Sequence, residues 1–391
     1  MLAFVVACLV GPLLLSLALT AWLRHMAPRW GLVDRPGPRK VHEQPTPMGG
    51  GIAVWTAVVF PLGIASLVVC GWVPGLPATS LLPDEVMDQL DLSRLGQRLV
   101  VLWSILAAGT LLGVLGLIDD FRNLPWGPRL AAQVLVAIGL VSVGVRATLF
   151  VQGPWAGGAA TVLWILVLVN AFNFLDNMDG LSAGIGLIAA ALFATVLLVG
   201  TPRPHWLVAG VLLVLVGALA GFLWHNRPPA RIFLGDAGSY FIGLLLAAVS
   251  IVATFYEASP SGASEIGRHV ILAPLFILAI PLYDFASVML IRLRSGLSPF
   301  HADKNHFSHR LVDLGLTRPQ AVLTVHLATL MTGLGGVLLY RVDDWASACL
   351  LLALITCVLA LVAVLETVGR RRARPAAGTD ATSGSRGDDG G

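Results

Sequence analysis

The sequence predicts an all-α, polytopic integral membrane protein with about eleven transmembrane helices. Of its 391 residues, 57% are hydrophobic and only 12% are charged, whereas roughly 25% of the residues in a soluble domain are charged. A membrane-spanning helix uses about 20 apolar residues, so the apolar residues suffice for about eleven spans. This composition excludes an ordinary soluble enzyme.

Eleven apolar windows mark the expected helices. Polar or glycine- and proline-rich segments separate them, as expected where spans meet water. We expect helices over residues 2–23, 52–72, 99–118, 130–151, 159–175, 183–200, 207–224, 239–256, 270–291, 321–340 and 346–366. The first window lacks a basic leader and a small-residue cleavage site, so we expect it to remain as a helix and not to leave as a signal peptide.

Basic residues lie mostly in alternate connections between these windows. The set that holds 19 of the 25 Lys and Arg residues comprises 24–51, 119–129, 176–182, 225–238, 292–320 and the tail. Cytoplasmic segments of membrane proteins are enriched in Lys and Arg. We therefore expect a multi-pass protein of the cell (inner, cytoplasmic) membrane with this set facing the cytoplasm, the N-terminus outside and the C-terminus inside.

The chain is expected to form one membrane-embedded domain over residues 1–366 and a disordered cytoplasmic tail over 367–391. The tail opens with GRRRAR and continues in Gly, Ser, Thr and Asp, a composition that buries too little apolar surface to fold. Arginines beside a membrane helix indicate contact with anionic membrane lipids. A formal net charge of +3 gives no reason to expect a nucleic-acid partner.

Two adjacent acids end the third expected helix. The segment GLIDDFRN places Asp119 and Asp120 at a helix C-terminus, where the helix dipole disfavours negative charge. One interpretation is a solvated helix end paired with Arg122 or Arg129. The other is a site built around a cation or a proton transfer.

The fifth expected helix continues into NAFNFLDNMDGL. Asn170, Asn173, Asp176 and Asp179 follow one another at three-residue steps, and each such step turns a helix by about 60°. The two amides therefore share a face, which the carboxylates continue into a turn opened by Gly180. A polar seam between helices is the alternative interpretation.

The segment RIFLGDAGS precedes the eighth expected helix. Asp236 lies between Gly235 and Gly238, and glycines allow the backbone to approach a ligand closely. Asp236 or Ser239 can equally serve as a helix cap, so this segment does not decide between the two roles.

The loop RLRSGLSPFHADKNHFSHRL gathers cationic side chains. Lys304, His306, His309 and Arg310 lie in it, and such groups bind phosphate oxygens. The alternatives are a zinc site built on the two histidines and a plain basic loop at the membrane surface.

The first polar loop, GLVDRPGPRKVHEQPTPMGGG, carries Lys40 and His42. Its prolines and glycines favour a structured loop that holds these cations at defined positions. A loop that only sets membrane topology is the alternative.

Taken in order, these motifs resemble the polyprenyl-phosphate N-acetylhexosamine-1-phosphate transferases, a family that includes the muramoyl-pentapeptide transferase of peptidoglycan synthesis. The resemblance runs from about Gly31 to Gly315. It rests on DRPxxRKxHxxPTP, the Asp119–Asp120 pair, NAFNFLDNMDGL, RIFLGDAGS and the segment PLYDFASVMLIRLRSGLSPFHADKNHFSHRL. It implies an eleven-helix membrane enzyme that uses Mg²⁺, or Mn²⁺ in its place.

The resemblance also implies a reaction. GlcNAc-1-phosphate, or another N-acetylhexosamine-1-phosphate, would pass from its UDP-sugar to undecaprenyl phosphate with release of UMP, as the first membrane step of a cell-envelope polysaccharide. One alternative is the phospho-MurNAc-pentapeptide transferase, whose loop is partly echoed by Pro47 to Gly50. A second is an ion-coupled transporter, although its acids would lie near the membrane midplane. A homodimer is left open.

Residue roles follow from the same resemblance. Asp236 and Asn173 would hold the metal on the nucleotide pyrophosphate, and Asp119 and Asp120 would act at the lipid phosphate. The expected substrate-binding residues are Asn170, Asp176, Asp179, Arg129, Lys40, His42, Lys304, His306, His309 and Arg310. Three positions depart from the family pattern: Ser308 replaces a common histidine, Arg129 a common lysine, and Met48 a common arginine.

Overall fold

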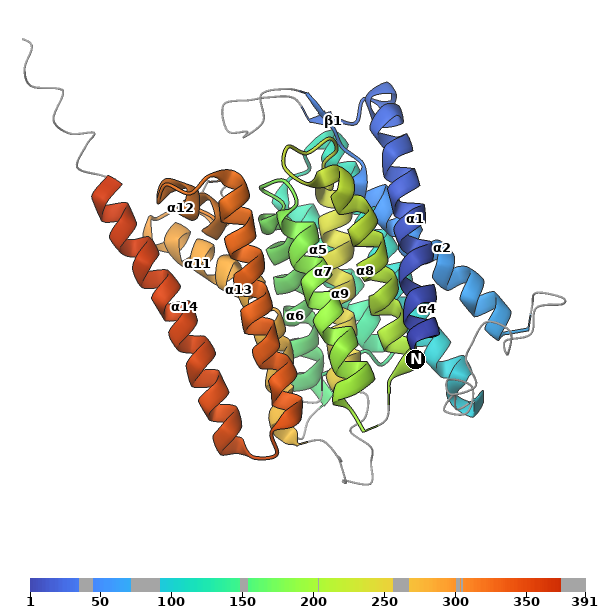
Figure 1. The fold of residues 1–391 in the computed structure, drawn as a ribbon. Helices are drawn as coiled ribbons and strands as arrows, with labels where there is room; N and C mark the ends of the chain where they lie inside the picture. The colour runs from blue at the N-terminus through green and yellow to red at the C-terminus, as the bar shows by residue number, and fades with distance from the viewer. Residues whose placement is uncertain are drawn as a thin grey trace, which may run out of the picture.

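The computed structural model describes residues 1–34, 45–71, 92–147, 154–202, 204–255, 267–299, 303 and 305–373. Over these residues the chain is a bundle of long helices, joined at one end by a short two-stranded ribbon (Figure 1). The strands of that ribbon, β1 (Val33–Asp34) and β2 (Thr46–Pro47), pair antiparallel. The expected polytopic, helical membrane protein is thereby confirmed.

Within the described ranges, nine helical spans are long and apolar enough to cross a membrane. Their helices are α1 (Leu2–Met26), α2 (Gly50–Val69), α4 (Leu92–Arg122), α6 (Pro154–Leu175), α7 (Leu181–Thr195, continued by the π-helical Val196–Gly200), α8 (Trp206–Asn226), α9 (Gly235–Phe255), α13 (Arg318–Leu338) and α14 (Trp345–Ala373).

The expected count of eleven spans is not confirmed. The window 130–151 corresponds to α5 (Trp126–Ser142), which has 17 residues, whereas a span needs about 20. The window 270–291 is split into η4 (Arg268–Leu272), α10 (Ala273–Ile277) and α11 (Ala279–Arg294), with a bend of 67°.

The break between α10 and α11 has a local cause. Pro281 has no backbone N–H, so it cannot donate the helical hydrogen bond to the carbonyl of Ile277. Leu278 between the two helices adopts φ −103° and ψ 18°, outside the helical range.

At the C-terminal end of the described chain, α14 extends to Ala373, past the expected end at residue 366.

One end of the bundle, called here the polar end, collects the connections after α1, α4, α6, α8 and α11. It also carries η1 (Ala27–Trp30), the β-ribbon and α12 (Phe307–Asp313). It lies at the top of Figure 1, whereas the N-terminus lies at the opposite end. Most Lys and Arg residues belong to the connections expected on the cytoplasmic side. The described parts of these connections therefore lie at the same end of the bundle.

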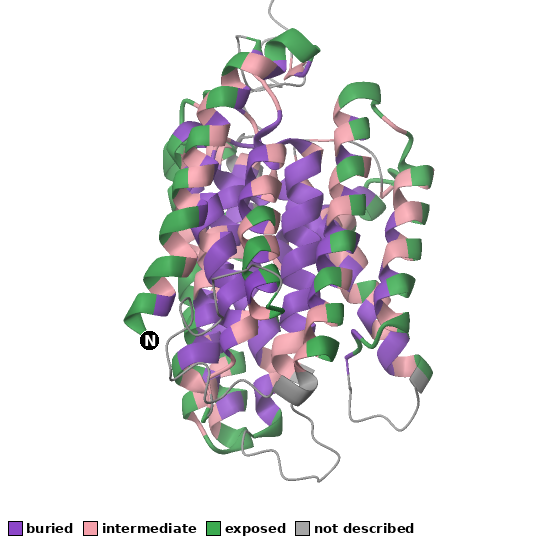
Figure 2. Ribbon diagram, turned by 90° about the vertical axis from the view of Figure 1, so that its right-hand side faces the viewer, coloured by how far each residue is buried: buried purple, intermediate pink, exposed green. Residues whose placement is uncertain are grey.

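The bundle has a buried centre and an apolar exterior. In Figure 2 buried residues are concentrated in the central helices and exposed residues on the outer ones. α8 packs against α1 and α7, and α9 packs against α4 and α6. Most exposed tryptophans of the described residues lie near the ends of the bundle, as at membrane interfaces. These are Trp22, Trp30, Trp126 and Trp224 toward the polar end, and Trp155 and Trp345 toward the other, whereas Trp103 lies inside α4.

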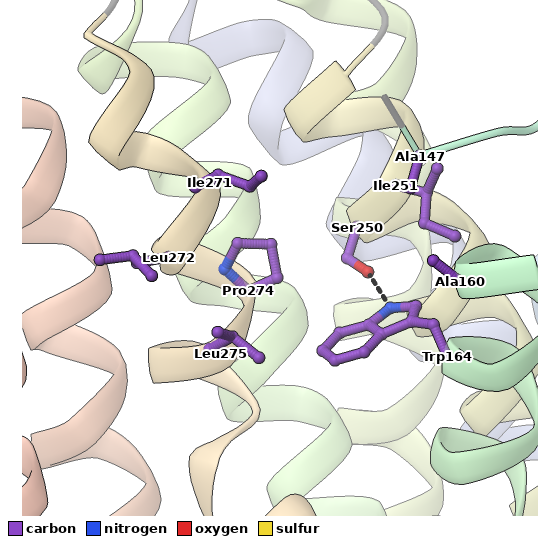
Figure 3. Close-up of a pocket in the computed structure, with 9 residues that line it drawn as sticks. All are labelled: Ala147, Ala160, Trp164, Ser250, Ile251, Ile271, Leu272, Pro274 and Leu275. Carbon is purple, nitrogen blue, oxygen red and sulfur yellow. Dashed lines mark hydrogen bonds between the residues drawn. The ribbon is translucent and has the colours of Figure 1, made fainter. Parts of the chain in front are cut away.

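An apolar pocket of about 230 Å³ lies between α6, α9, η4 and α10 (Figure 3). Trp164 donates a hydrogen bond to Ser250 at 3.0 Å in its wall. None of the described side chains that line it is titratable.

Glycines let α2 and α4 approach the start of α9 closely. A Cβ atom at Gly51 would lie 2.3 Å from the backbone nitrogen of Gly238, and one at Gly116 would lie 2.4 Å from the carbonyl of Asp236. The backbone N–H groups of Gly50 and Gly51 also donate to the carbonyls of Phe233 and Leu234, both at 2.9 Å. These contacts fix the segment that leads into Asp236.

We expect Gly116→Ala to destabilise the fold, because the added methyl group must push α4 away from the backbone of α9. Overpacking of this kind costs about 1–3 kcal/mol. Gly139→Ala is the matched control, since Gly139 also lies inside a helix but has no atom within 4 Å of its added Cβ. Thermal denaturation in detergent would measure both, and an equal loss in the two variants would contradict the close-packing interpretation.

Candidate active site

Four separate helices meet at the polar end to form an acidic site. Asp119 and Asp120 come from the last turns of α4, Arg129 from the first turn of α5, Asn173 from the last turn of α6 and Asp236 from the first turn of α9. Asp176 and Tyr240 border them from the α6–α7 turn and from α9. The sequence-predicted catalytic and metal-binding residues are therefore brought together.

Asp120 binds the N-terminus of α9. Its Oδ1 accepts the backbone N–H of Asp236 at 2.9 Å, and its Oδ2 accepts that of Ala237 at 3.3 Å. The first N–H groups of a helix lack partners within the helix and favour a negative charge. The cap of α9 thus comes from α4, and the side chain of Asp236 is left for other contacts.

Asp119 is buried, with 4% of its side chain exposed. One of its oxygens accepts the backbone N–H of Leu124 at 2.6 Å, and the other forms an ion pair with Arg129. The guanidinium Nη1 of Arg129 also lies 3.8 Å from Oδ2 of Asp236. The pairing of Asp119 with Arg129, left open by the sequence, is present, and Arg129 lies between two of the acids.

Tyr240 is a site residue that the sequence analysis missed. Its hydroxyl group lies 3.5 Å from both Asp119 Oδ2 and Arg129 Nη1, and the side chain is buried. Tyr240 follows Asp236 by four residues in α9, so both side chains share one helix face. That spacing is the signal that could have identified it.

Asn173 contacts Asp236 directly. Its side-chain amide donates to Asp236 Oδ1 at 2.7 Å and reaches Ser239 Oγ at 3.3 Å. The side chain of Asp236 is 29% exposed. Asp236 lies beside Asn173 and Arg129 at the polar end of the bundle. A partly exposed carboxylate at this position can contact a ligand.

The other acids of the α6–α7 turn bind backbone groups of the α8–α9 connection. Asp176 Oδ2 accepts the N–H of Gly235 at 3.1 Å, and Asp179 Oδ2 accepts that of Ala230 at 2.9 Å. Asn170 lies deeper and donates to Gln133 of α5 at 2.7 Å. In this structure these three residues therefore hold the scaffold together, and Asp176 in addition lies close enough to Asp120 for the two carboxyl groups to repel each other.

Removal of water raises the pKa of Asp176 from 3.8 to about 8, and repulsion from Asp120 adds to this shift. The hydrogen bond from Gly235 opposes it by stabilising the carboxylate. A cation placed among these acids would relieve the same repulsion.

The loop expected to bind phosphate is partly used for internal contacts. Arg310 of α12 is buried, forms an ion pair with Glu366 of α14 at 2.9 Å and donates to Ser287 at 2.9 Å. His306 contacts Asp284 at 3.0 Å, and its ring centroid lies 6.3 Å from that of His309. The remaining predicted cations, Lys40, His42 and Lys304, lie outside the described residues.

The donor set suits a hard cation bound together with a ligand. Among the described residues, no group of three or more His, Cys, Asp or Glu side chains converges as a closed metal cage. Asp236 and Asn173 instead offer oxygen atoms at the rim of an acidic site. Mg²⁺ is commonly bound by one or two carboxylates, with water and substrate phosphates completing its coordination, so these residues fit that ion.

The chain matches one family model and several known transferases, and these matches agree with one another. Residues 102–254 match the family described as Glycosyl transferase family 4. The chain is 34% identical over 334 residues to the decaprenyl-phosphate N-acetylglucosaminephosphotransferase of Mycolicibacterium smegmatis, covering 79% of this chain and 75% of the relative. It is 27% identical over 345 residues to the undecaprenyl-phosphate alpha-N-acetylglucosaminyl 1-phosphate transferase of Escherichia coli, covering 84% and 83%.

We expect Asp176→Asn to change how stability depends on pH. Between pH 3.8 and about 8 the folded protein keeps a proton on Asp176 that the unfolded chain releases, so the free energy of unfolding falls as pH rises. The variant cannot titrate at this position. The melting temperature of the variant should therefore rise relative to that of the wild type as pH increases from about 5 to 8.

Melting temperatures in detergent with EDTA would measure this effect, because a bound cation would favour the ionised carboxylate. Asp313→Asn, at an exposed position of α12, is the control. A difference between Asp176→Asn and wild type that stays constant across this pH range would contradict the expectation.

Proposed function

We propose a specific reaction for this chain, which belongs to the family of polyprenyl-phosphate N-acetylglucosamine-1-phosphate transferases. In this reaction GlcNAc-1-phosphate passes from UDP-GlcNAc to a polyprenyl phosphate such as undecaprenyl phosphate, and UMP is released. The observation that carries the proposal is the meeting of Asp119, Asp120, Asp236 and Arg129 at the polar end of an apolar bundle.

The location of the site suits two substrates of different solubility. The acceptor keeps its chain in lipid and its phosphate at the interface, while the nucleotide sugar arrives from water. Acids at the end of the bundle, and not at its midplane, meet both groups. We place this end at the cytoplasmic face of the cell membrane, because most Lys and Arg residues lie in its connections.

Charge is the main obstacle to this reaction. A phosphate monoester has a second pKa of about 6 and is mostly a dianion at pH 7, so its deprotonation is less demanding than its approach to a pyrophosphate. Mg²⁺ held by Asp236 and Asn173 would neutralise the pyrophosphate and act as a Lewis acid. Arg129, whose side chain is 29% exposed, would donate hydrogen bonds to phosphate oxygens.

The contacts of Asp119 favour direct displacement over a phospho-enzyme intermediate. A carboxylate nucleophile must bring one of its oxygens into contact with phosphorus, which a buried side chain does not allow. Asp119 is buried, and its two oxygens accept from Leu124 and Arg129. In the proposed mechanism Asp119 orients Arg129, Asp120 holds the start of α9, and the lipid phosphate attacks the β-phosphorus of UDP-GlcNAc as UMP leaves.

We expect purified protein to release UMP from UDP-GlcNAc only when undecaprenyl phosphate and Mg²⁺ are both present. Asp236→Asn should lower turnover by about 100-fold or more, because it removes the carboxylate that would hold Mg²⁺ against the pyrophosphate. Chromatographic measurement of UMP would follow the reaction. Asp313→Asn, at an exposed site, should retain wild-type turnover.

UDP-MurNAc-pentapeptide, supplied in a parallel reaction, tests the peptidoglycan alternative. UMP release with that donor, and none with UDP-GlcNAc, would indicate that the chain acts in peptidoglycan synthesis. Folded wild-type protein that releases no UMP from either donor would refute the proposed reaction.

A further inference from the structure

A buried acid contacts the ring of His306. Asp284 of α11 has no exposed surface, and both of its carboxylate oxygens are occupied. Oδ1 accepts the backbone N–H of Phe307, and Oδ2 lies 3.0 Å from Nδ1 of His306. No role was expected for Asp284 from the motifs in the sequence.

Arg292 and Arg310, the described arginines of α11 and α12 that are buried, are bonded elsewhere. Arg292 donates to both oxygens of Asp303, at 3.1 and 3.2 Å, and Arg310 pairs with Glu366. A buried carboxylate is costly unless hydrogen-bonded or paired. His306 is therefore the side chain that meets Asp284.

This pairing determines which ring nitrogen of His306 carries the hydrogen. An ionised carboxylate only accepts hydrogen bonds, whereas a neutral imidazole has one donor and one acceptor nitrogen. Contact with Asp284 selects the ring form with hydrogen on Nδ1. Nε2, on the far side of the ring, is left with a lone pair that can take up and release a proton.

His306, with 8% of its side chain exposed, packs against the segment that carries Asn173. Its ring meets Phe174 edge-on, with 5.5 Å between centroids, and Phe174 directly follows Asn173 in α6. Two residues after His306, Ser308 donates to Asn177 of the α6–α7 turn at 2.7 Å. α12 is thus attached to the same segment that carries Asn173 and Asp176.

We propose that Asp284 is a positioning residue that acts through His306, fixing its ring orientation and its Nδ1–H form so that Nε2 can take up a proton and then donate it in a hydrogen bond to a phosphate oxygen of the substrate. This inference rests on the proposed function for the identity of the substrate. The geometry of the pair itself does not depend on that function.

Asp284→Asn reverses the hydrogen-bonding requirement at His306. The N–H of Phe307 can only donate, so the single side-chain oxygen of the asparagine must face it. The amide NH₂ then faces Nδ1 of His306, which has to accept, and the hydrogen moves to Nε2. The ring keeps its place but loses the ability to take up a proton at Nε2.

We expect Asp284→Asn to lower turnover by about 100-fold, within the range for loss of a positioned proton-transfer group. His306→Gln should cost a similar factor. If Asp284 acts through His306, the double variant should be no slower than the slower single variant. Losses that multiply in the double variant would overturn the inference. Asp313→Asn, at the exposed end of α12, is the control.

Nitrogen-15 spectra of histidine-labelled protein in lipid nanodiscs give a readout that needs no substrate. The His306 signal, assigned by its absence in His306→Gln, should show Nδ1–H in wild type and Nε2–H in Asp284→Asn. An unchanged signal would overturn the inference, even if wild-type protein releases no UMP. UMP release by wild type reports separately on the proposed function.

Discussion

The N-terminus of α9 is the point on which the acidic site depends. Its first backbone N–H groups donate to Asp120 and Asp176, which come from α4 and from the α6–α7 turn. Carboxylates crowded together repel one another, and they cost less when each accepts hydrogen bonds from fixed donors. By supplying these donors, α9 holds acids from two other chain segments around its own Asp236.

This arrangement requires the backbones to be unusually close. Side chains at Gly51 or Gly116 would collide with the backbone around Asp236 and Gly238, so α2 and α4 reach α9 only through glycine. In a bilayer, helices gain little from burying apolar surface against each other, and small residues allow the close packing that holds them together. The packing that stabilises the bundle also positions the site.

Two arginines of the polar end differ in their surroundings. Arg129 stands between Asp119 and Asp236 and remains partly exposed, as its proposed contact with phosphate requires. Arg310 is instead buried against Glu366 and ties α12 to α14. A positive charge in a predicted phosphate-binding loop can thus serve the fold, because a buried guanidinium needs a carboxylate more than it needs exposure.

The sequence by itself determined the fold class, most of the spans and the family, because apolar windows and ordered motifs are local patterns. Only the tertiary structure decided that Asp120 and not Asp236 caps α9, through a contact across 116 residues. The same holds for Arg310, whose partner Glu366 lies 56 residues away. Local patterns specify which residues can bond, whereas helix packing selects the partners, since each buried charge takes the donor or acceptor that the neighbouring helices bring within reach.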